Sequence, residues 1–435
     1  MDLKLGIVKG ARKLLSLVGR GGSLPGSIAL AMDKDFIKRF KMPKTVILVT
    51  GTNGKTTTSN LIAESLRASG LSVINNHRGD NLNVGIATLL ATNADSNYEI
   101  HADAVVIEVD ELTLYRQFKN LHPTHLVVTN FFRDQLDRAG EMETIIRKIM
   151  SVTEDFTGTL ILNGDDPNVL RLQDNAKNAT TYLFSVGKQE DSKEVTDEAS
   201  EGKFCPRCGN RLHYDYYQYS HIGRFICPND HYGEIQPSVL VEKIDKEKGT
   251  FTVDKKEYHS FINAIYAIYN CACVLTVMKA LNLDYANADK VFSTYKLKEG
   301  RNETFNLSNP CVINLIKNPT GANEVMKEIN SHSEEKIICI FLNDNDQDGH
   351  DVSWIWDAHF ERLNEPNIKE IVCSGLRAYD MALRLKYEGL EEKIKVIEDS
   401  SKAVHYLNEA NINSYIMCTY TALHATRAIL RKEEK

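Results

Sequence analysis

Short apolar runs alternate with amphipathic stretches along the chain, and this pattern predicts two α/β domains. In the first half the runs are rich in β-branched residues and the stretches between them have helical spacing, which is typical of a parallel sheet covered by helices. We expect strands at Thr45–Thr50, Ala104–Val109, His125–Thr129 and Thr159–Leu162. A second set follows the apolar helical stretch Ile262–Leu281. Its expected strands are Cys311–Ile316, Lys336–Leu342, Ile368–Cys373 and Ser414–Cys418.

The same pattern divides the chain into three parts. Residues 1–43 form an N-terminal helical segment, residues 44–298 a central domain and residues 299–435 a C-terminal α/β domain, with the boundary near Leu297–Gly300. Within the central domain, a tyrosine- and cysteine-bearing stretch at about 203–234 indicates a small insertion. The first helix, Met1 to about Arg20, is apolar on one side and basic on the other. It either packs on its own domain or contacts an anionic membrane surface.

Composition and charge exclude several classes of protein. The 435 residues carry 59 acidic and 52 basic side chains mixed along the length, a net charge of −7, which argues against a protein that coats nucleic acid. No run approaches the ~20 apolar residues of a membrane span, and the N-terminus lacks the apolar core of a secretion signal. We therefore expect a cytoplasmic protein.

A glycine-containing loop between the first expected strand and the helix Ser59–Ala68 predicts a phosphate-binding site. Its residues are Gly51, Thr52, Asn53, Gly54, Lys55, Thr56 and Thr57. Glycines let main-chain amides converge on phosphate oxygens, Lys55 can reach the β- and γ-phosphates, and the Thr56 hydroxyl can bind Mg²⁺. Val49 stands where the usual motif has its first glycine, so a chance glycine turn is the alternative. The flanking strand and helix favour ATP binding.

Polar residues also end the next two strands, where a doubly wound sheet binds its ligands. They are Glu108, Asp110, Asn130, Arg133, Asp134 and Asp137. A carboxylate in this place can hold a Mg²⁺ that bridges phosphates, and we favour Glu108 because it directly ends an apolar strand. Glu111 is interpreted as a solvated loop acid. For Asp137 both interpretations stay open.

Three cysteines in the insertion indicate a metal site. Cys205 and Cys208 have the spacing of one zinc knuckle, and Cys227 begins a second. The fourth ligand is Asp230 or His231, and we favour His231 because imidazole is the better zinc ligand beside thiolates. Four protein ligands make such a Zn²⁺ structural. The other six cysteines are interpreted as core thiols, and two histidines of the insertion as polar loop residues: Cys271, Cys273, Cys311, Cys339, Cys373, Cys418, His213 and His221.

Taken together, these motifs resemble the Mur ligase family, in particular the synthetase subunits of lipid II isoglutaminyl synthases. The resemblance covers nearly the whole chain. Besides the phosphate loop and Glu108, it rests on Thr129–Asp137, Asn163–Pro167 and Gly300–Glu303. Amino-acid-adding members usually have histidine where Gln135 stands, and an acidic residue and a histidine where Asn314 and Lys317 stand. These departures point away from amino-acid addition.

The resemblance implies ATP-dependent amidation of the α-carboxyl of D-isoglutamate in the lipid II stem peptide, through an acyl phosphate, to give D-isoglutamine for peptidoglycan. Ammonia would come from glutamine hydrolysis, which needs a nucleophilic cysteine. Cys373 lacks the preceding glycine of such a nucleophile turn. A separate glutaminase subunit is therefore implied, forming a heterodimer and docked on the C-terminal domain. An amino-acid-adding Mur or folylpolyglutamate-type ligase and a zinc-ribbon nucleic-acid adaptor are the alternatives.

The resemblance also assigns residues to roles. In the polar segment Asn343–Asp357 it implies a catalytic aspartate, which we assign to Asp351. Lys55 and Glu108 are the other two catalytic residues that it implies. This segment superficially resembles a calcium loop without its late glutamate, and its acids Asp344 and Asp346 are equally explained as helix caps. Further nucleotide contacts are implied for Asn81, Asn130, Asn270, Arg301, Lys317 and Asn318. The implied cofactors are ATP, Mg²⁺ and a structural Zn²⁺.

Overall fold

A computed structural model describes residues 3–16, 23–77, 79–133, 142–196, 198, 201–297 and 300–434 of the chain. They belong to two compact units: Met1–Phe131 with Glu143–Lys296, and Phe132–Met142 with Leu297–Lys435. Over the described ranges, no helix is both long and apolar enough to cross a membrane.

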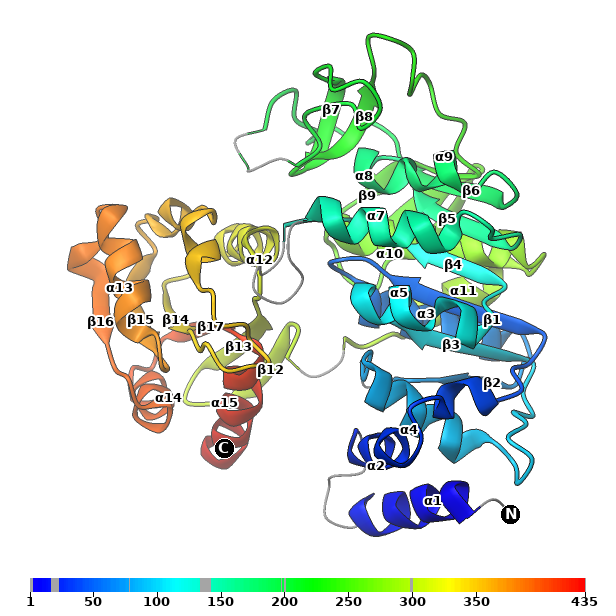
Figure 1. Ribbon diagram of the computed structural model, residues 1–435. Coiled ribbons are helices and arrows are strands. Elements are labelled where there is room, and N and C mark those ends of the chain that lie inside the picture. Colours follow the sequence, from blue (N-terminus) through cyan, green and yellow to red (C-terminus); the bar gives the residue numbers. More distant parts are fainter. Residues whose placement is uncertain are drawn as a thin grey trace. The chain divides into compact units, whose positions relative to one another are not determined.

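The first unit is built on a nine-stranded sheet with the order β11-β10-β9-β6-β5-β4-β1-β3-β2 (Figure 1). Its strands are β1 (Thr45–Thr50), β2 (Val73–Asn75), β3 (Ala104–Glu108), β4 (His125–Val128), β5 (Thr159–Asn163), β6 (Thr180–Val186), β9 (Val239–Asp245), β10 (Thr250–Val253) and β11 (Lys256–His259). The expected parallel sheet is confirmed from β2 to β9. At the other edge β9, β10 and β11 are antiparallel. The two-residue turn Asp254-Lys255, with positive φ at both residues, folds β11 straight back on β10.

The strand order places three loops at one edge of the sheet. The chain runs from β1 outward to β2, returns to β3 and then crosses β1 to β4, so the order reverses around β1. Val49 of β1 lies opposite Glu108 of β3, and Thr50 lies opposite Val128 of β4. Ligands of doubly wound sheets bind outside the carboxyl ends of the strands at such a reversal.

Helices cover this sheet. They are α3 (Lys55–Ala68), α5 (Glu111–Leu121), α7 (Met142–Thr153), α8 (Pro167–Leu170), α9 (Leu172–Asn175), α10 (Ile265–Ala280) and α11 (Tyr285–Phe292). α10 is apolar on all sides and therefore buried, packed on β5, β6, β9, α3 and α11. The insertion forms a separate hairpin of β7 (His213–Tyr219) and β8 (Ile222–Ile226).

The N-terminal helices pack on one another within the first unit. α1 (Leu3–Ser16) lies against α2 (Leu24–Met32) and α4 (Asn83–Asn93) (Figure 1). Leu5 and Val8 are buried there, Lys4 pairs with Asp33 at 3.2 Å, and the Arg12 guanidinium donates to Thr92 at 2.9 Å. These contacts describe the first of the two alternatives for the basic helix, packing on its own domain.

The second unit has a six-stranded sheet with the order β12-β13-β17-β14-β15-β16, parallel except at its β12 edge. Its strands are β12 (Glu303–Asn306), β13 (Pro310–Leu315), β14 (Lys336–Phe341), β15 (Ile368–Ser374), β16 (Ile394–Val396) and β17 (Asn413–Cys418). Its helices are α12 (Pro319–Ser331), α13 (Ala378–Tyr387), α14 (Ser400–Glu409) and α15 (Tyr420–Glu433), with 3₁₀ turns at Ser353–Trp356, Phe360–Leu363 and Glu391–Lys393. One core holds Trp354, Phe360 and Met381, and the other holds Leu407 and Leu423.

Every strand expected from the sequence is present within one residue of its expected bounds. The six cysteines interpreted as core thiols are buried. Helix α3 begins four residues earlier than the expected Ser59, at Lys55, because the left-handed Gly54 (φ 83°) already starts it.

Candidate functional site

The loop after β1 adopts a conformation that only glycine permits at two positions. Gly51 has φ 124°, and a Cβ there would lie 2.3 Å from the Thr129 hydroxyl oxygen. Gly54 has φ 83°, and a Cβ there would lie 2.7 Å from Asn270 Oδ1. The loop is held from β4: the Thr52 amide donates to the Asn130 carbonyl at 2.9 Å and the Asn53 amide to Asn130 Oδ1 at 2.8 Å. The loop is therefore fixed in shape at the N-terminus of α3, where anions bind.

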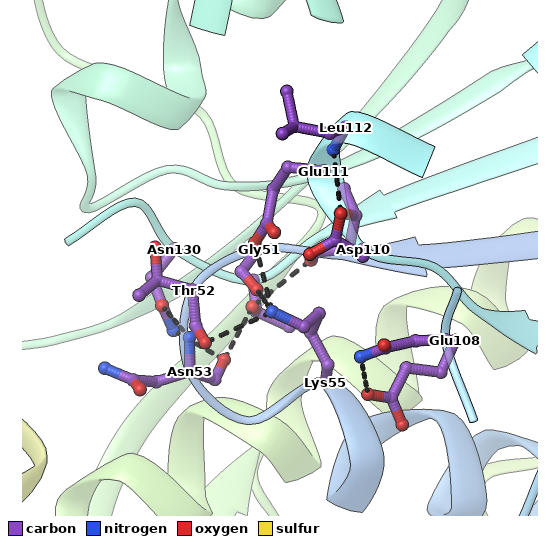
Figure 2. Close-up of polar contacts among 12 residues, drawn as sticks. Gly51, Thr52, Asn53, Lys55, Glu108, Asp110, Glu111, Leu112 and Asn130 are labelled. Atoms are coloured by element: carbon purple, nitrogen blue, oxygen red, sulfur yellow. Dashed lines mark hydrogen bonds and ion pairs between the residues drawn. The ribbon is translucent and has the colours of Figure 1, made fainter. Parts of the chain in front are cut away.

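Lys55 lies buried under this loop, with 8% of its surface exposed. Its ammonium donates to the carbonyls of Gly51 at 2.5 Å and Thr52 at 3.3 Å, and forms an ion pair with Glu111 at 3.0 Å (Figure 2). The Glu111 side chain is only 13% exposed. The interpretation of Glu111 as a solvated loop acid is therefore wrong, because the fold brings the start of α5 over the lysine.

Glu108 ends β3, and its two carboxylate oxygens differ in their hydrogen bonding. Oε1 accepts from the Asn81 amide at 2.8 Å, whereas the buried Oε2 has no hydrogen-bond partner among the described residues. A Cβ on Gly79 would lie 3.2 Å from both Glu108 Oε2 and Thr56 Oγ1, so these two oxygens converge on one place. A buried carboxylate oxygen beside a hydroxyl fits Mg²⁺, which prefers oxygen ligands. Asp110, by contrast, caps α5 by accepting from the amides of Leu112 and Thr113.

Asn270 reaches the same loop from α10. Its Oδ1 accepts from the Thr58 hydroxyl at 3.2 Å, beside Gly54. The structure thus brings together, in the first unit, the loop residues with Asn81, Glu108, Asn130 and Asn270. Thr57 is buried in the first turn of α3.

In the second unit, the polar segment after β14 is tied to neighbouring elements. Asp348 is buried and accepts from the amide and the hydroxyl of Thr421, at the start of α15. Asp344 pairs with Arg377 at 3.2 Å, and the exposed Asp346 with His350 at 3.0 Å. Because these acids face three different partners, they do not form the calcium loop that was one alternative for this segment.

Asp351 lies half-buried at the end of this segment, and its Oδ1 accepts from the Ser353 amide at 2.8 Å. The Ser353 hydroxyl and amide hold the pKa of the Asp351 carboxyl below its ordinary value, so it is ionised at neutral pH. The other residues implied for the nucleotide lie in this unit too. Asn318 is buried and caps α12, while Arg301 and Lys317 are placed before β12 and after β13.

The cysteine-bearing insertion brings four ligand atoms together. The thiols of Cys205, Cys208 and Cys227 and the imidazole of His231 lie within 4.8 Å of one another. Cys208 Sγ and Cys227 Sγ are 3.6 Å apart, and Cys205 Sγ is 3.7 Å from His231 Nδ1. A tetrahedral Zn²⁺ with bonds of about 2.3 Å places sulfur ligands about 3.8 Å apart, so this set fits zinc. Of the two residues left open, His231 belongs to the group and Asp230 does not.

Removing one thiol should therefore remove the metal. We expect Cys208→Ser to lose its zinc and to lower the melting temperature by roughly 3–5 °C, as a loss of ~2–3 kcal/mol does in a unit of this size. Metal analysis and thermal unfolding measure both effects. The control is Cys273→Ser, at a buried thiol in α10, which should lose stability and keep the metal. Full zinc content in Cys208→Ser would contradict the site.

Comparison with known proteins shows the family to which this chain is similar. The model of the Mur ligase middle domain matches residues 49–229, and that of the MurT ligase C-terminal domain matches residues 315–423. The lipid II isoglutaminyl synthase (glutamine-hydrolyzing) subunit MurT of Staphylococcus aureus (strain COL) is 35% identical, over 91% of this chain and 90% of that protein. Its namesake in Streptococcus pneumoniae (strain ATCC BAA-255 / R6) is 34% identical over 100% of both chains.

The chain belongs to the MurT family of Mur ligases. It is accordingly an ATP-dependent ligase of the Mur type, as the sequence predicted. Solved structures agree on the fold. A pseudomurein peptide ligase type C from Methanothermus fervidus has a TM-score of 0.70 at 20% identity, covering 91% of this chain and 80% of its own. The Mycobacterium tuberculosis folylpolyglutamate synthase, complexed with ADP and AMPPCP, has a TM-score of 0.61 at 13% identity, covering 99% and 100%.

Some of the predicted MurT-family residues lie outside the described part of the chain. Some residues that contact the site were not predicted from the sequence. Asp134, Gln135 and Asp137 lie outside the described residues. Asn76 was missed, although its side chain bonds both the amide and the carbonyl of Glu108 at 2.8 Å. Its signal was its place directly after β2, a strand too short to recognise. His221, interpreted as a polar loop residue, is fully buried between two carboxylates, and that interpretation is wrong.

Proposed function

We propose that this protein is the synthetase subunit of a lipid II isoglutaminyl synthase. In this reaction the α-carboxyl of D-isoglutamate in the lipid II stem peptide becomes the amide of D-isoglutamine, driven by ATP. The names of the full-length relatives supply the substrate class. The observation that carries the chemistry is the buried, open oxygen of Glu108 beside Thr56 at the end of the phosphate loop.

Carboxylate activation is the first step. A substrate carboxylate oxygen attacks the γ-phosphorus of ATP, the bond to the β–γ bridging oxygen breaks, and ADP leaves an acyl phosphate behind. We propose that the amides of Gly51–Thr57 bind the phosphates and that Lys55 offsets the charge that develops on their oxygens. Thr56 and Glu108 would hold Mg²⁺, which supplies further charge neutralisation.

Amide formation is the second step. The lone pair of ammonia attacks the acyl carbon, the bond to the phosphate oxygen breaks, and the nitrogen loses a proton. We propose Asp351 as the acceptor of that proton, because its carboxyl is half-buried, ionised and held by Ser353. Asn270 would contact the adenine, and Arg301, Lys317 and Asn318 the nucleotide. We place the reaction in the cytoplasm, where ATP is supplied.

The ammonia would come from a second, glutamine-hydrolysing subunit. Within this chain, Cys373 is unsuited to that role, because burial raises the pKa of its thiol to about 12. The relatives are themselves named as subunits. We propose that the partner docks on the C-terminal unit, at an apolar stripe made of exposed side chains on and beside α13. The stripe consists of Trp356, Leu376, Tyr379, Leu383 and Tyr387, each 48–72% exposed.

Two observations support this docking face. Tyr379, Leu383 and Tyr387 follow at intervals of four, so they line one side of α13, which gives a continuous apolar surface. The start of α13 is also bonded to the segment that carries Asp351: the Leu376 amide donates to Asn343 Oδ1 at 3.0 Å, and Arg377 pairs with Asp344. A subunit docked here would release ammonia beside that segment.

Substitutions in the stripe should lower the rate of amidation with glutamine but not the rate with ammonium. We expect Tyr379→Ser/Leu383→Ser to lower glutamine-driven amidation at least about 10-fold in the presence of the partner, while ammonium-driven amidation is unchanged. Leu240→Ser, at a 39% exposed leucine in the first unit, is the control and should change neither rate. Equal glutamine-driven rates for wild type and the double variant would reject this docking face.

Mass spectrometry tests the function itself. Protein, ATP, Mg²⁺, ammonium and lipid II should give a product about one mass unit lighter than lipid II, as a hydroxyl is replaced by an amino group, together with ADP. If mass is unchanged and ADP appears only when a free amino acid is added, the protein is an amino-acid-adding ligase and the proposal is wrong.

A further inference from the structure

The turn Asn163–Pro167, between β5 and α8, contains two fully buried carboxylates that the mechanism above does not use. Asp165 and Asp166 are both 0% exposed. Burying a charge is costly unless it is fully hydrogen-bonded, so both side chains need strong partners. Their partners lie on different elements.

Asp166 is bonded directly to the segment that shapes the phosphate loop. Its Oδ2 accepts from the Phe131 amide at 2.8 Å, and Phe131 follows Asn130. Asn163 of the same turn donates to the Thr129 carbonyl at 3.0 Å. This turn thus holds residues 129–131 at the end of β4. Within this segment, Asn130 accepts hydrogen bonds from the amides of Thr52 and Asn53.

Asp165 makes a comparable connection toward α10. Its Oδ2 accepts from the Tyr269 hydroxyl at 2.7 Å, and its Oδ1 from the Ser185 hydroxyl at 2.6 Å. Tyr269 precedes Asn270, which contacts Thr58 beside the loop. The turn therefore holds both asparagines that flank the phosphate loop, one through each carboxylate.

His221 joins the cysteine-bearing insertion to this turn. It lies between β7 and β8, is fully buried, and its Nε2 is 3.3 Å from Asp166 Oδ1. On its other side Nδ1 is 3.5 Å from Glu201. Burial alone lowers the pKa of His221, but the two carboxylates outweigh burial and raise that pKa to about 9, so the ring is charged at neutral pH. Tyr214 also faces this place, its hydroxyl bonding the carbonyls of Gly202 and His221.

We propose that Asp166 is a positioning residue for the nucleotide site. We also propose that His221, through Asp166, makes nucleotide affinity depend on the packing of the cysteine-bearing insertion against the turn Asn163–Pro167. The contact sequence is His221 to Asp166, Asp166 to the Phe131 amide, and Asn130 to the amides of Thr52 and Asn53. This inference rests on the proposed binding of nucleotide at the phosphate loop. It adds a role for the insertion, which otherwise only folds beside the sheet.

Calorimetric binding of MgADP to the whole protein tests it. We expect His221→Gln to raise the dissociation constant about 3- to 10-fold and Asp166→Asn about 10-fold. Since both act through one contact, the double variant should bind no more weakly than Asp166→Asn alone. Zinc content of His221→Gln should match wild type, which shows that the insertion is still folded.

Glu201→Gln is the matched control. It removes the other carboxylate partner of the same histidine and leaves the contact between His221 and Asp166 in place. It should lower the melting temperature and leave the dissociation constant within about twofold, because a purely structural effect changes stability alone. If wild type fails to bind MgADP, the proposed nucleotide site is wrong. If wild type binds it, and His221→Gln and Asp166→Asn bind it equally well, only the positioning role is rejected.

Discussion

Replacing Lys55 by alanine should lower the rate of acyl phosphate formation by about 10²–10³-fold or more, the usual cost of removing one preorganised charge from a transition state. The Lys55 ammonium is held under the loop by the Gly51 and Thr52 carbonyls and by Glu111. One of these three hydrogen bonds would pass to a phosphate oxygen when the nucleotide binds. Single-turnover release of ADP in the presence of lipid II measures the step.

This substitution also removes the lysine partner of the nearly buried Glu111, so stability must be separated from catalysis. A carboxylate that loses its buried partner destabilises a protein by roughly 3–5 kcal/mol. In Lys55→Ala/Glu111→Gln the residue at position 111 no longer carries a charge. We expect the double variant to recover most of the melting temperature and none of the activity. Recovery of activity with stability would show that Lys55 acts only as a structural partner.

Replacing Asp351 by asparagine should lower ammonium-driven amidation by about 10²–10⁴-fold, the range that proton transfer by a positioned side chain contributes. Asparagine keeps the oxygen that accepts from the Ser353 amide, so the segment should keep its shape. MgADP affinity and the melting temperature should change little. Product formation from lipid II, followed by mass, measures the loss.

Asp346→Asn provides the matched comparison for this prediction. Asp346 lies in the same segment, is 95% exposed and pairs with His350. The same chemical change there should leave the rate within about twofold, since an exposed pair contributes little. If Asp351→Asn amidates as fast as Asp346→Asn, Asp351 is not the proton acceptor.

Local signals in the sequence were sufficient for the strands and for the phosphate loop. Val46–Val49 is a continuous apolar run because β1 is buried on both faces, and Gly51 and Gly54 mark the positions where φ is positive. Glu108 could be identified because it ends such a run. The knuckle spacing of Cys205 and Cys208 predicted a metal-binding turn, since it depends on a few neighbouring residues only.

Long-range electrostatics could not be predicted in the same way. The sequence does not show that Glu111 lies over Lys55, 56 residues away, or that His221 lies between Asp166 and Glu201. An exposed loop acid and a buried ion-pair partner have the same local sequence. Whether such a side chain is exposed to solvent or paired in the interior depends on how α5 and the insertion pack on the sheet.

The sequence by itself thus determined the order and type of the elements, the family resemblance and the residues that can bind phosphate and metal, because periodicity and motif spacing are properties of adjacent residues. The tertiary structure alone decided which charges are buried and what they face. Burial and charge pairing arise when segments distant in the chain pack together, and they turn a glutamate into a lysine's partner and a loop histidine into a buried cation.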